Sequence, residues 1–478
     1  MKIRIENGMI VSHEKRYGGN ILIRDGIVSA ITEPGCKPNA EVVIDAKGKF
    51  ILPGVIDSHV HFQDPGFTHR EEFESATAAA AVGGVTTAIS HPMNDPPIVD
   101  VESYNFTMEA YRGRGYIDYG IHGGGTSNNI DKIEALWNKT GAISIKMFMC
   151  NSVEEFPFVR DDAMYEIMQK VAASDGLVMI HAENNELIQM EEKRLKMNGR
   201  IDPAAYHESH SMAGELEAVK RAIYFLEITG ARGVILHSGM ESALREIKLA
   251  KDRGVKVFAE CCPHFFTFVD SDLTKLGPYL KFSPVMRDEK NRRQLWKMLS
   301  EGYIDTIGSD HSPYTEEEKL QGIHNIWNAP NGIPGIQNLL TVLLDGASKG
   351  LVSLEKIVAV TSYNPSRIYG LDYRKGTLEV GKDADLVLVD MDREKEFTKA
   401  DILSKAKWSP YVGRQFKGWP VLTMVRGKIV AQDGIAIGNP GHGIYISRKK
   451  MKGEELWQDM YGRKMAAGNG MELLRAMK

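Results

Sequence analysis

Several features that would assign the chain to a particular class are scarce in its sequence. Four cysteines in 478 residues are too few for a disulfide framework. No basic segment followed by an apolar one opens the chain, as a secretory signal would. No apolar run reaches the ~20 residues that a membrane-spanning helix needs. We therefore expect a soluble, cytoplasmic protein without a membrane partner. The four cysteines are Cys36, Cys150, Cys261 and Cys262.

Neither sign of charge is in excess. The chain has 63 acidic and 59 basic side chains, which gives a formal net charge of −4. This balance provides no electrostatic reason to expect a nucleic acid partner, so the expected ligand is a small molecule. A chain of this length that is 43% hydrophobic can bury a large core, and two structural units are favoured over one.

Short β-branched or apolar runs recur from Val55 onward, and most of them precede a segment of helical composition. Strands that alternate with helices pair in parallel through crossover connections. Eight such units predict an α/β protein with a (β/α)8 TIM barrel. The runs lie at residues 55–62, 85–92, 116–123, 142–149, 176–183, 233–239, 255–264 and 303–311.

Both flanks of this barrel have strand patterns instead. Residues 1–52 contain ILIRDGIVSAI, whose two alternating runs meet at Asp25-Gly26 as in a hairpin. Residues 373–440 contain VLTMVRGKIVAQDG, which also reads as a pair of strands. Because neither flank has enough strands for a stable sheet, we expect both to form one small β-domain beside a barrel of residues 53–372.

The last segment, residues 441–478, is predicted to be a helical tail. It contains MKGEELWQDMYGRKM and MELLRAMK, separated by a Gly468-Asn469-Gly470 break. Its methionines, leucines and Trp457 could cover a subunit interface. They could equally pack on their own chain, since apolar stripes at helical spacing usually indicate packing.

Histidine is concentrated at one end of the predicted strands. Of the fourteen histidines, eight lie at or just beyond C-terminal strand ends, the face where barrel enzymes build their active sites. For one histidine alone, a hydrogen-bonded structural role is at least as good an explanation. Convergence from several strands, with Asp310 nearby, suits a borderline cation such as zinc better. The eight are His59, His61, His91, His122, His181, His237, His264 and His311.

Two local patterns sharpen the metal hypothesis. His59 and His61 occupy positions i and i+2 of one predicted strand, so both side chains point into the barrel mouth. Lys146 lies in the apolar run AISIKMFM, and a lone buried ammonium costs on the order of several kcal/mol unless it is paired or chemically altered. A lysine carboxylated by carbon dioxide would be an anionic oxygen ligand able to bridge two metal ions.

The order of these residues along the chain resembles the cyclic amidohydrolases, which include hydantoinases, dihydropyrimidinases, allantoinases and dihydroorotases. The segments PGVIDSHVHF, GGVTTAISHPMNDPP, MIHAEN, CCPHFFTF, GSDHSPY and KGTLEVGKDADLVLVD resemble that family too, and together they span nearly the whole chain. The resemblance implies a binuclear zinc site, a carboxylated Lys146, a β-sandwich built from both chain ends, and a homodimer or homotetramer.

The resemblance also implies roles for six side chains. Asp310 would be the general base, which takes a proton from water and passes it to the leaving ring nitrogen. Two zinc ions would lower the pKa of that water to about 7 and stabilise the oxyanion during ring opening of a cyclic amide or ureide. The implied ligands are His59, His61 and Asp310 for the more buried ion, His181 and His237 for the other, and Lys146 for both.

Departures from the family patterns narrow the choice of substrate. Dihydroorotases usually have an arginine two residues after the second histidine, where this chain has Gln63, and an asparagine where it has Met93. A substrate carboxylate would lack its charge-assisted partner, so dihydroorotase ranks third. Hydantoinases and dihydropyrimidinases usually have a tyrosine five residues after the bridging lysine, where this chain has Asn151. Allantoinases resemble the chain in HVHFQDPG and NSVEEFP, which includes Ser152, but depart from it in WNAPNGIPG.

Because hydantoinases and allantoinases act on the same kind of ring, we expect a five-membered cyclic ureide of the hydantoin type. Ser283 and Asn331 would bind its imide edge, although Asn331 before Gly332 is equally well explained as a turn residue. Some relatives of dihydropyrimidinase are assembly proteins that have lost metal ligands, whereas this chain keeps all six. The predicted substrate-binding residues are Gln63, Asn151, Ser152, His264, Ser283 and Asn331.

Overall fold

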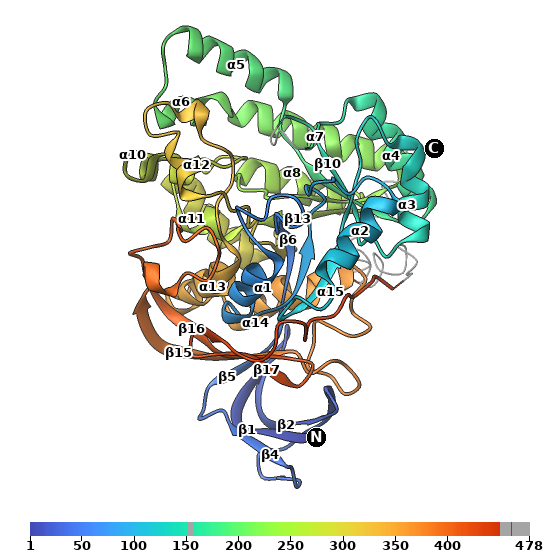
Figure 1. Ribbon diagram of the computed structural model, residues 1–478, viewed down its shortest axis with the longest axis vertical. Coiled ribbons are helices and arrows are strands. Elements are labelled where there is room, and N and C mark those ends of the chain that lie inside the picture. The colour runs from blue at the N-terminus through green and yellow to red at the C-terminus, as the bar shows by residue number, and fades with distance from the viewer. Residues whose placement is uncertain (152–155, 450–459, 461–478) are drawn as a thin grey trace.

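A computed structural model describes residues 1–151, 156–449 and 460, and it contains a parallel barrel next to a β-sheet (Figure 1). All eight predicted barrel strands are present, and the third is split into two short pieces by His122. The barrel strands are β6 (Val55–Val60), β7 (Val85–Ser90), β8 (Asp118–Ile121), β9 (Gly123–Gly124), β10 (Ile145–Phe148), β11 (Leu177–His181), β12 (Arg232–Ile235), β13 (Val257–Cys261) and β14 (Thr306–Ile307).

Backbone hydrogen bonds close these strands into a ring. The strands pair in the orders β14-β13-β12-β11-β10-β9 and β6-β7-β8. The two groups meet at the split third strand, whose pieces pair in parallel with β7 and β10. Between β14 and β6, the His61 N–H donates to the His311 carbonyl over 2.7 Å, and Val60 pairs in parallel with His311. All C-terminal strand ends therefore lie on one rim, and the predicted barrel is confirmed.

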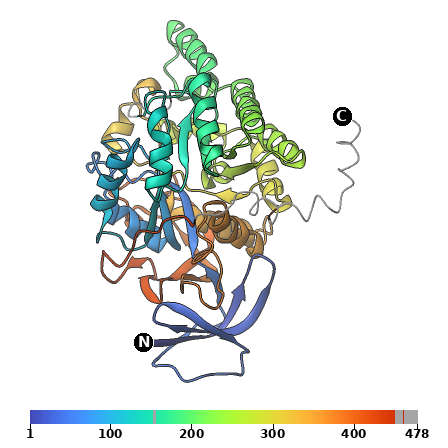
Figure 2. The same cartoon turned by 90° about the vertical axis from the view of Figure 1, so that its right-hand side faces the viewer.

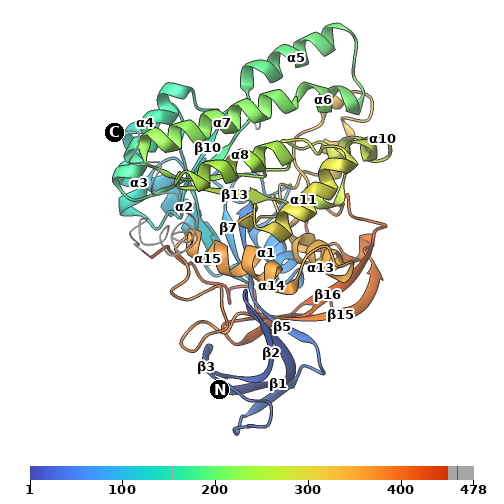
Figure 3. The ribbon, with the colours of Figure 1, turned by 180° about the vertical axis from the view of Figure 1, so that it is seen from behind.

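Helices surround the barrel, as the alternating pattern predicts (Figures 1 and 3). The strands are buried along their length, as expected of parallel strands covered by helices. The helices are α1 (Phe73–Val82), α2 (Val101–Tyr111), α3 (Ile133–Lys139), α4 (Asp161–Ala173), α5 (Asn185–Met197), α6 (Pro203–Ser209), α7 (Met212–Thr229), α8 (Glu241–Asp252), α9 (Pro263–Thr267), α10 (Leu273–Leu276), α11 (Glu289–Glu301), α12 (Glu316–Leu320), α13 (Leu339–Ser348), α14 (Leu354–Val358) and α15 (Asn364–Ile368).

Strands from both chain ends form one sheet of nine strands below the barrel (Figure 2). Its order is β18-β17-β16-β15-β5-β1-β2-β3, with β4 paired to β1, and the antiparallel β5–β15 pair joins the two flanks. The predicted hairpin is confirmed, since Asp25 and Gly26 have φ of 52° and 84° in a two-residue turn. The strands are β1 (Lys2–Val11), β2 (Arg16–Arg24), β3 (Ile27–Thr32), β4 (Val42–Asp45), β5 (Phe50–Pro53), β15 (Leu386–Glu396), β16 (Gln415–Val425), β17 (Lys428–Gln432) and β18 (Ile435–Ala436).

The start of the predicted helical tail is extended instead of helical. Residues 441–449 contain no helix, because they run beside β8: the Ile446 N–H donates to the Tyr119 carbonyl over 2.7 Å, and the Tyr119 N–H to that of Ile444 over 3.0 Å. Ile446 joins the apolar cluster inside the lower part of the barrel. Apart from Met460, the rest of the predicted tail lies outside the described residues. Within the described ranges, no helix is both long and apolar enough to cross a membrane.

A buried cation lies where the barrel meets the sheet. The Lys375 Nζ is 2.6 Å from Asp118, 2.6 Å from Asp385 and 2.9 Å from Asp383. The Arg426 Nε is 3.1 Å from the same Asp118 carboxylate. Burial opposes protonation of Lys375, but Asp118 and then the other two carboxylates raise its pKa above the ordinary value. Because Asp118 belongs to β8 and Arg426 follows β16, this network connects the barrel to the sheet.

Replacing Lys375 by methionine should destabilise the protein strongly, because three buried carboxylates would lose their shared counterion. We expect a loss of about 3–5 kcal/mol in the free energy of unfolding, measured by urea titration. The matched control is Lys349→Met, which removes an ammonium that is 59% exposed and pairs with Asp345, and it should cost about 0–1 kcal/mol. Equal effects of the two substitutions would contradict a connecting role for Lys375.

Candidate metal centre

The six predicted metal ligands come together at the C-terminal rim of the barrel. They line one pocket, although they derive from strands far apart in the sequence. His59 lies on β6, Lys146 on β10 and His181 at the end of β11, while the others follow their strands closely. The pocket is lined by His59, His61, Met93, Lys146, Phe148, His181, His237, Phe282, Ser283, Asp310, Ser312, Asn331 and Gly332.

Three of these side chains converge on one point. The Nε2 atoms of His59 and His61 lie 3.0 and 3.3 Å from the same oxygen, Oδ1 of Asp310. In a tetrahedral zinc site with bonds of 2.0–2.1 Å, neighbouring ligand atoms are roughly 3.3 Å apart. The spacing and the donor types therefore fit a single cation held by these three residues.

A second pair of ligand atoms lies beside the first set. Nδ1 of His181 is 2.9 Å from Nε2 of His237. The other ring nitrogen of His237 is buried and has no hydrogen-bond partner in the part of the chain that the structure describes. Ligand atoms of His59, His237 and Asp310 all lie within 4.8 Å of one another. The two sets are close enough for two neighbouring cations to share a bridging ligand.

Lys146 is in position to supply such a bridge after chemical change. It is only 1% exposed and forms no ion pair among the described residues, its Nζ lying 4.3 Å from the centre of the Phe148 ring. Burial lowers the pKa of Lys146 to about 8, against the opposing effect of Asp310. Carbon dioxide reacts with the neutral form of an amine. The resulting carbamate anion would be attracted to cations held by the surrounding imidazoles.

The charges in this pocket favour a bound cation. Burial lowers the pKa of His59, but the carboxylates of Asp310 and Glu260 outweigh it and raise the value to about 9. For His61 burial dominates and lowers the pKa to about 4. Burial likewise opposes ionisation of Asp310, yet His59 holds its pKa well below the ordinary value. A cation at this point would take the place of the proton that His59 shares with Asp310.

The backbone is strained at two of the predicted ligands. His237 and Asp310 have φ of 34° and 49°, and Gln63 has φ of 61°, a left-handed region that non-glycine residues adopt at a cost of about 1–3 kcal/mol each. Such strain persists only where the surrounding structure holds the residue in place. Its presence at the rim supports a functional role for these positions.

Two further histidines of the rim have structural partners. The Nδ1 of His122 lies 2.7 Å from the Ser144 hydroxyl, and its Nε2 lies 3.1 Å from the Ser58 carbonyl. The Nδ1 of His311 accepts from the Gly335 N–H over 3.1 Å. For these two residues the hydrogen-bonded explanation holds, so proximity to the rim alone does not indicate a ligand.

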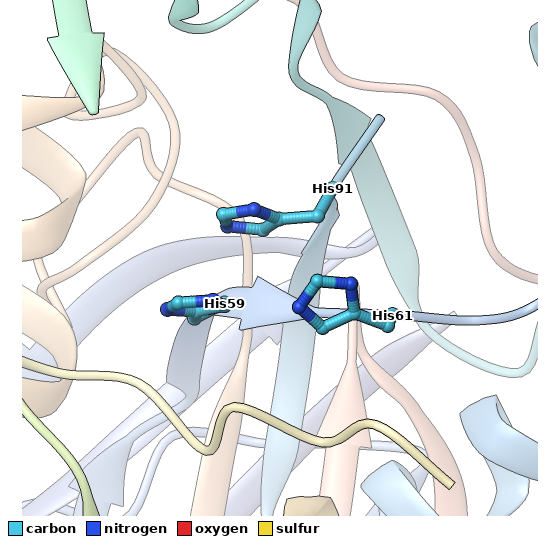
Figure 4. Close-up of side chains that lie close together, drawn as sticks. All are labelled: His59, His61 and His91. Carbon is cyan, nitrogen blue, oxygen red and sulfur yellow. The ribbon is translucent and has the colours of Figure 1, made fainter. Parts of the chain in front are cut away.

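His91 and His264 contact the site without lining its pocket. Figure 4 shows His59, His61 and His91 side by side, and the rings of His59 and His91 stack with centroids 4.0 Å apart. His264 packs between Phe265 and Phe282, at centroid distances of 4.3 and 4.4 Å. Both histidines therefore pack directly against residues that line the pocket.

Only some of the predicted substrate-binding residues line the pocket. Ser283 and Asn331 line the pocket, whereas Gln63, Asn151 and His264 are not among its lining residues. Gln63 is buried in its strained turn, and Asn151 is exposed. Ser152 lies outside the described residues. Substrate binding by all six therefore stays a prediction.

Several residues of the site are absent from the sequence-based predictions. Glu260 and Glu183 contact His59 and His181 from behind, at 2.6 and 2.8 Å, and Phe148 and Phe282 form part of the pocket wall. An acidic residue within the otherwise apolar strand VFAEC was a signal that could have revealed Glu260.

Comparisons with known proteins agree with this geometry. Residues 50–430 match the model of the amidohydrolase family. The chain is 36% identical over 448 residues to an L-hydantoinase of Paenarthrobacter aurescens, covering 93% of this chain and 98% of that protein. It is 34% identical over 444 residues to an allantoinase of Deinococcus radiodurans, covering 92% and 97%.

Solved structures show the same relationship. The L-hydantoinase (dihydropyrimidinase) from Arthrobacter aurescens superposes with a TM-score of 0.91 at 35% identity, covering 93% of this chain and 99% of that one. A D-hydantoinase superposes with a TM-score of 0.88 at 31% identity, covering 94% and 100%. The similarity therefore includes both the barrel and the sheet.

Zinc should raise the unfolding temperature of the protein, because a cation that binds only the folded state stabilises it by about 2.7 kcal/mol at 100 times its Kd.

In His237→Ala we expect the metal content after dialysis to fall from two ions to one, measured by elemental analysis. His122→Asn is the control, since it changes a buried histidine with structural partners and should leave two ions bound. Equal metal loss in both variants would contradict the ligand assignment.

Proposed function

The chain belongs to the amidohydrolase family, and we propose that it hydrolytically opens a five-membered cyclic ureide of the hydantoin type, using two zinc ions and a carboxylated Lys146. The observation that carries this proposal is the convergence of four imidazoles, one carboxylate and a buried lysine in a single pocket. This lysine has no ion-pair partner among the residues that the structure describes. Similarity to hydantoinases and allantoinases over nearly the whole chain supports it.

The residues present fit this cofactor by number and by donor type. His59, His61 and Asp310 would hold one ion, and His181 and His237 the other, with Lys146 shared. When bound, the two cations would supply Lewis acidity and a lowered pKa for water. Zinc accepts imidazole and carboxylate ligands readily, and their close spacing needs no large rearrangement of the rim.

Asp310 is suited to move the proton of the reaction. It is ionised, since its pKa lies well below the ordinary value, and its side chain is 15% exposed where that of His59 is 1% exposed. Asp310 thus reaches from the ligand set into the open part of the pocket. There its carboxylate would accept a proton from the attacking water and deliver it to the leaving ring nitrogen.

The pocket wall favours a ring without a carboxylate. Apart from Lys146, the described residues that line it include no arginine or lysine, so among them the carboxylate of dihydroorotate would have no guanidinium partner. Ser283 and Asn331 offer hydrogen bonds to the edge of a ureide. This composition supports hydantoin chemistry over dihydroorotase chemistry.

An apolar substituent on the ring is also favoured. Met93 and Phe148 pack with the buried Phe156 in one apolar cluster, and Phe282 completes the apolar part of the wall. A hydrophobic group at carbon 5 of a hydantoin would bury itself there, whereas the ureido group of allantoin would lose hydrogen bonds to water. Allantoin is the second candidate, because relatives named allantoinase match 92% of the chain.

We also propose a homodimer or homotetramer in the cytoplasm, as the family resemblance implies. Size-exclusion chromatography coupled to light scattering would test the assembly.

A panel of ring-opening assays should reveal the substrate. We expect kcat/KM to be highest for 5-benzylhydantoin, at least roughly tenfold lower for allantoin, as the apolar wall predicts, and lowest for dihydroorotate. Phe148→Ala should reduce the preference for the benzyl group. Phe158→Ala is its control, because Phe158 packs against the same cluster without lining the pocket. Turnover of dihydroorotate alone would refute the proposal.

Lys146→Ala should abolish both metal binding and turnover, since the bridge between the two ligand sets would be lost. A short carboxylic acid such as propionate should restore part of the activity by occupying the vacated space. Propan-1-ol serves as the control because it has similar size without an anionic oxygen or an amine that carbon dioxide could carboxylate, and it should not rescue. Full activity of the variant without any addition would exclude a bridging lysine.

A further inference from the structure

We propose that two buried glutamates, Glu260 and Glu183, position the two halves of the metal centre, each by holding the far nitrogen of one ligand imidazole. Neither residue is a predicted ligand. The inference rests on the proposed metal centre, and it assigns to each half a separate positioning residue. Such carboxylate–histidine pairs fix the ring orientation and the tautomer of a metal ligand.

Glu260 holds the imidazole of His59. It lies on β13 and is fully buried, with Oε1 2.6 Å from Nδ1 of His59. Its second oxygen accepts from the Ser58 hydroxyl over 3.1 Å. The Nδ1–H of His59 therefore donates to Glu260, and once a cation displaces the proton on Nε2, the lone pair of Nε2 lies on the side where Asp310 is 3.0 Å away.

A glycine in the barrel leaves room for the side chains of His59 and Glu260. Gly308 follows β14, between β13 and β6 in the ring. A Cβ atom at this position would lie 2.7 Å from the Cβ of His59 and 2.9 Å from Oε2 of Glu260, closer than real Cβ contacts come. A glycine is therefore required here for the His59–Glu260 pair to keep its place.

Glu183 holds His181 by the opposite nitrogen. Its Oε2 is 2.8 Å from Nε2 of His181, and it is 2% exposed. This leaves Nδ1 of His181 facing Nε2 of His237 at 2.9 Å. The two glutamates thus select different ring nitrogens, Nε2 in His59 and Nδ1 in His181, and each choice directs a lone pair towards the shared pocket.

The partners of these glutamates argue against a purely stabilising role. Within the described residues, Glu183 has side-chain contacts of hydrogen-bond or ion-pair type only with His181. Within the same described residues, the corresponding side-chain contacts of Glu260 are with His59 and Ser58. Burying a carboxylate against a neutral imidazole, as that of His181 is and that of His59 would be once it holds a cation, gains little for the fold, since desolvation offsets the interaction. The buried Glu215 differs, because it pairs with the Arg287 guanidinium over 2.6 Å.

The test uses the isosteric variants Glu260→Gln and Glu183→Gln of the zinc-loaded protein. We expect each to lower the affinity of one of the two ions by about 10–100-fold, so that dialysis against a chelator leaves one ion where the wild type keeps two. The visible absorption spectrum of the cobalt-substituted protein should change in each variant, which reports ligand geometry independently of turnover. Glu215→Gln is the matched control and should keep both ions and the wild-type spectrum.

Wild-type metal affinity and cobalt spectra in both glutamine variants would overturn the inference. Should Glu260→Gln fail to fold, Gly308→Ala gives a second test, because its new methyl group displaces the same pair and should loosen one ion. Retention of both ions with an unchanged spectrum in that variant would also count against Glu260. A wild-type protein that binds two ions but opens no cyclic amide would refute the proposed function and leave this inference standing.

Discussion

The constraint on which the site depends is the burial of opposite charges inside one narrow barrel. Oδ1 of Asp310 lies 3.0 and 3.3 Å from two buried imidazole nitrogens, and Lys146 has no carboxylate partner among the described residues. Unpaired charge at such depth is expensive, so groups of this kind persist where a cation or a chemical modification completes them. The stacked rings of His59 and His91 and the glutamates that contact His59 and His181 surround these same buried charges.

Much of this arrangement could be predicted from the sequence, because it depends on strand periodicity. The eight barrel strands follow from β-branched runs, and parallel pairing then brings their C-terminal ends to one rim. His59 and His61 face the same way because strand side chains alternate. Periodicity places eight histidines at this rim but does not separate His181 and His237 from His122 and His311. The six ligands were predicted from the resemblance to cyclic amidohydrolases.

Other parts could not be predicted, since they depend on contacts between distant segments. Phe282 reaches the pocket from a loop whose path is set by tertiary packing, and Gln63, in a left-handed conformation, is not among the described lining residues. The segment around Ile446 is extended because β8 offers it backbone partners, which local helix propensity does not reveal. Glu260 faces His59 across the barrel interior, and only the ring closure brings them together.

The pairing of β5 with β15 has a consequence for how the chain is made. The first flank leaves the ribosome early, yet the strand that covers its open edge is encoded far downstream. At about 5–20 residues per second, the roughly 330 residues between them take on the order of 20–70 s to synthesise. During that interval β5 presents unpaired backbone groups to the cell. The edge of β5 is therefore covered only after nearly the whole chain has been made.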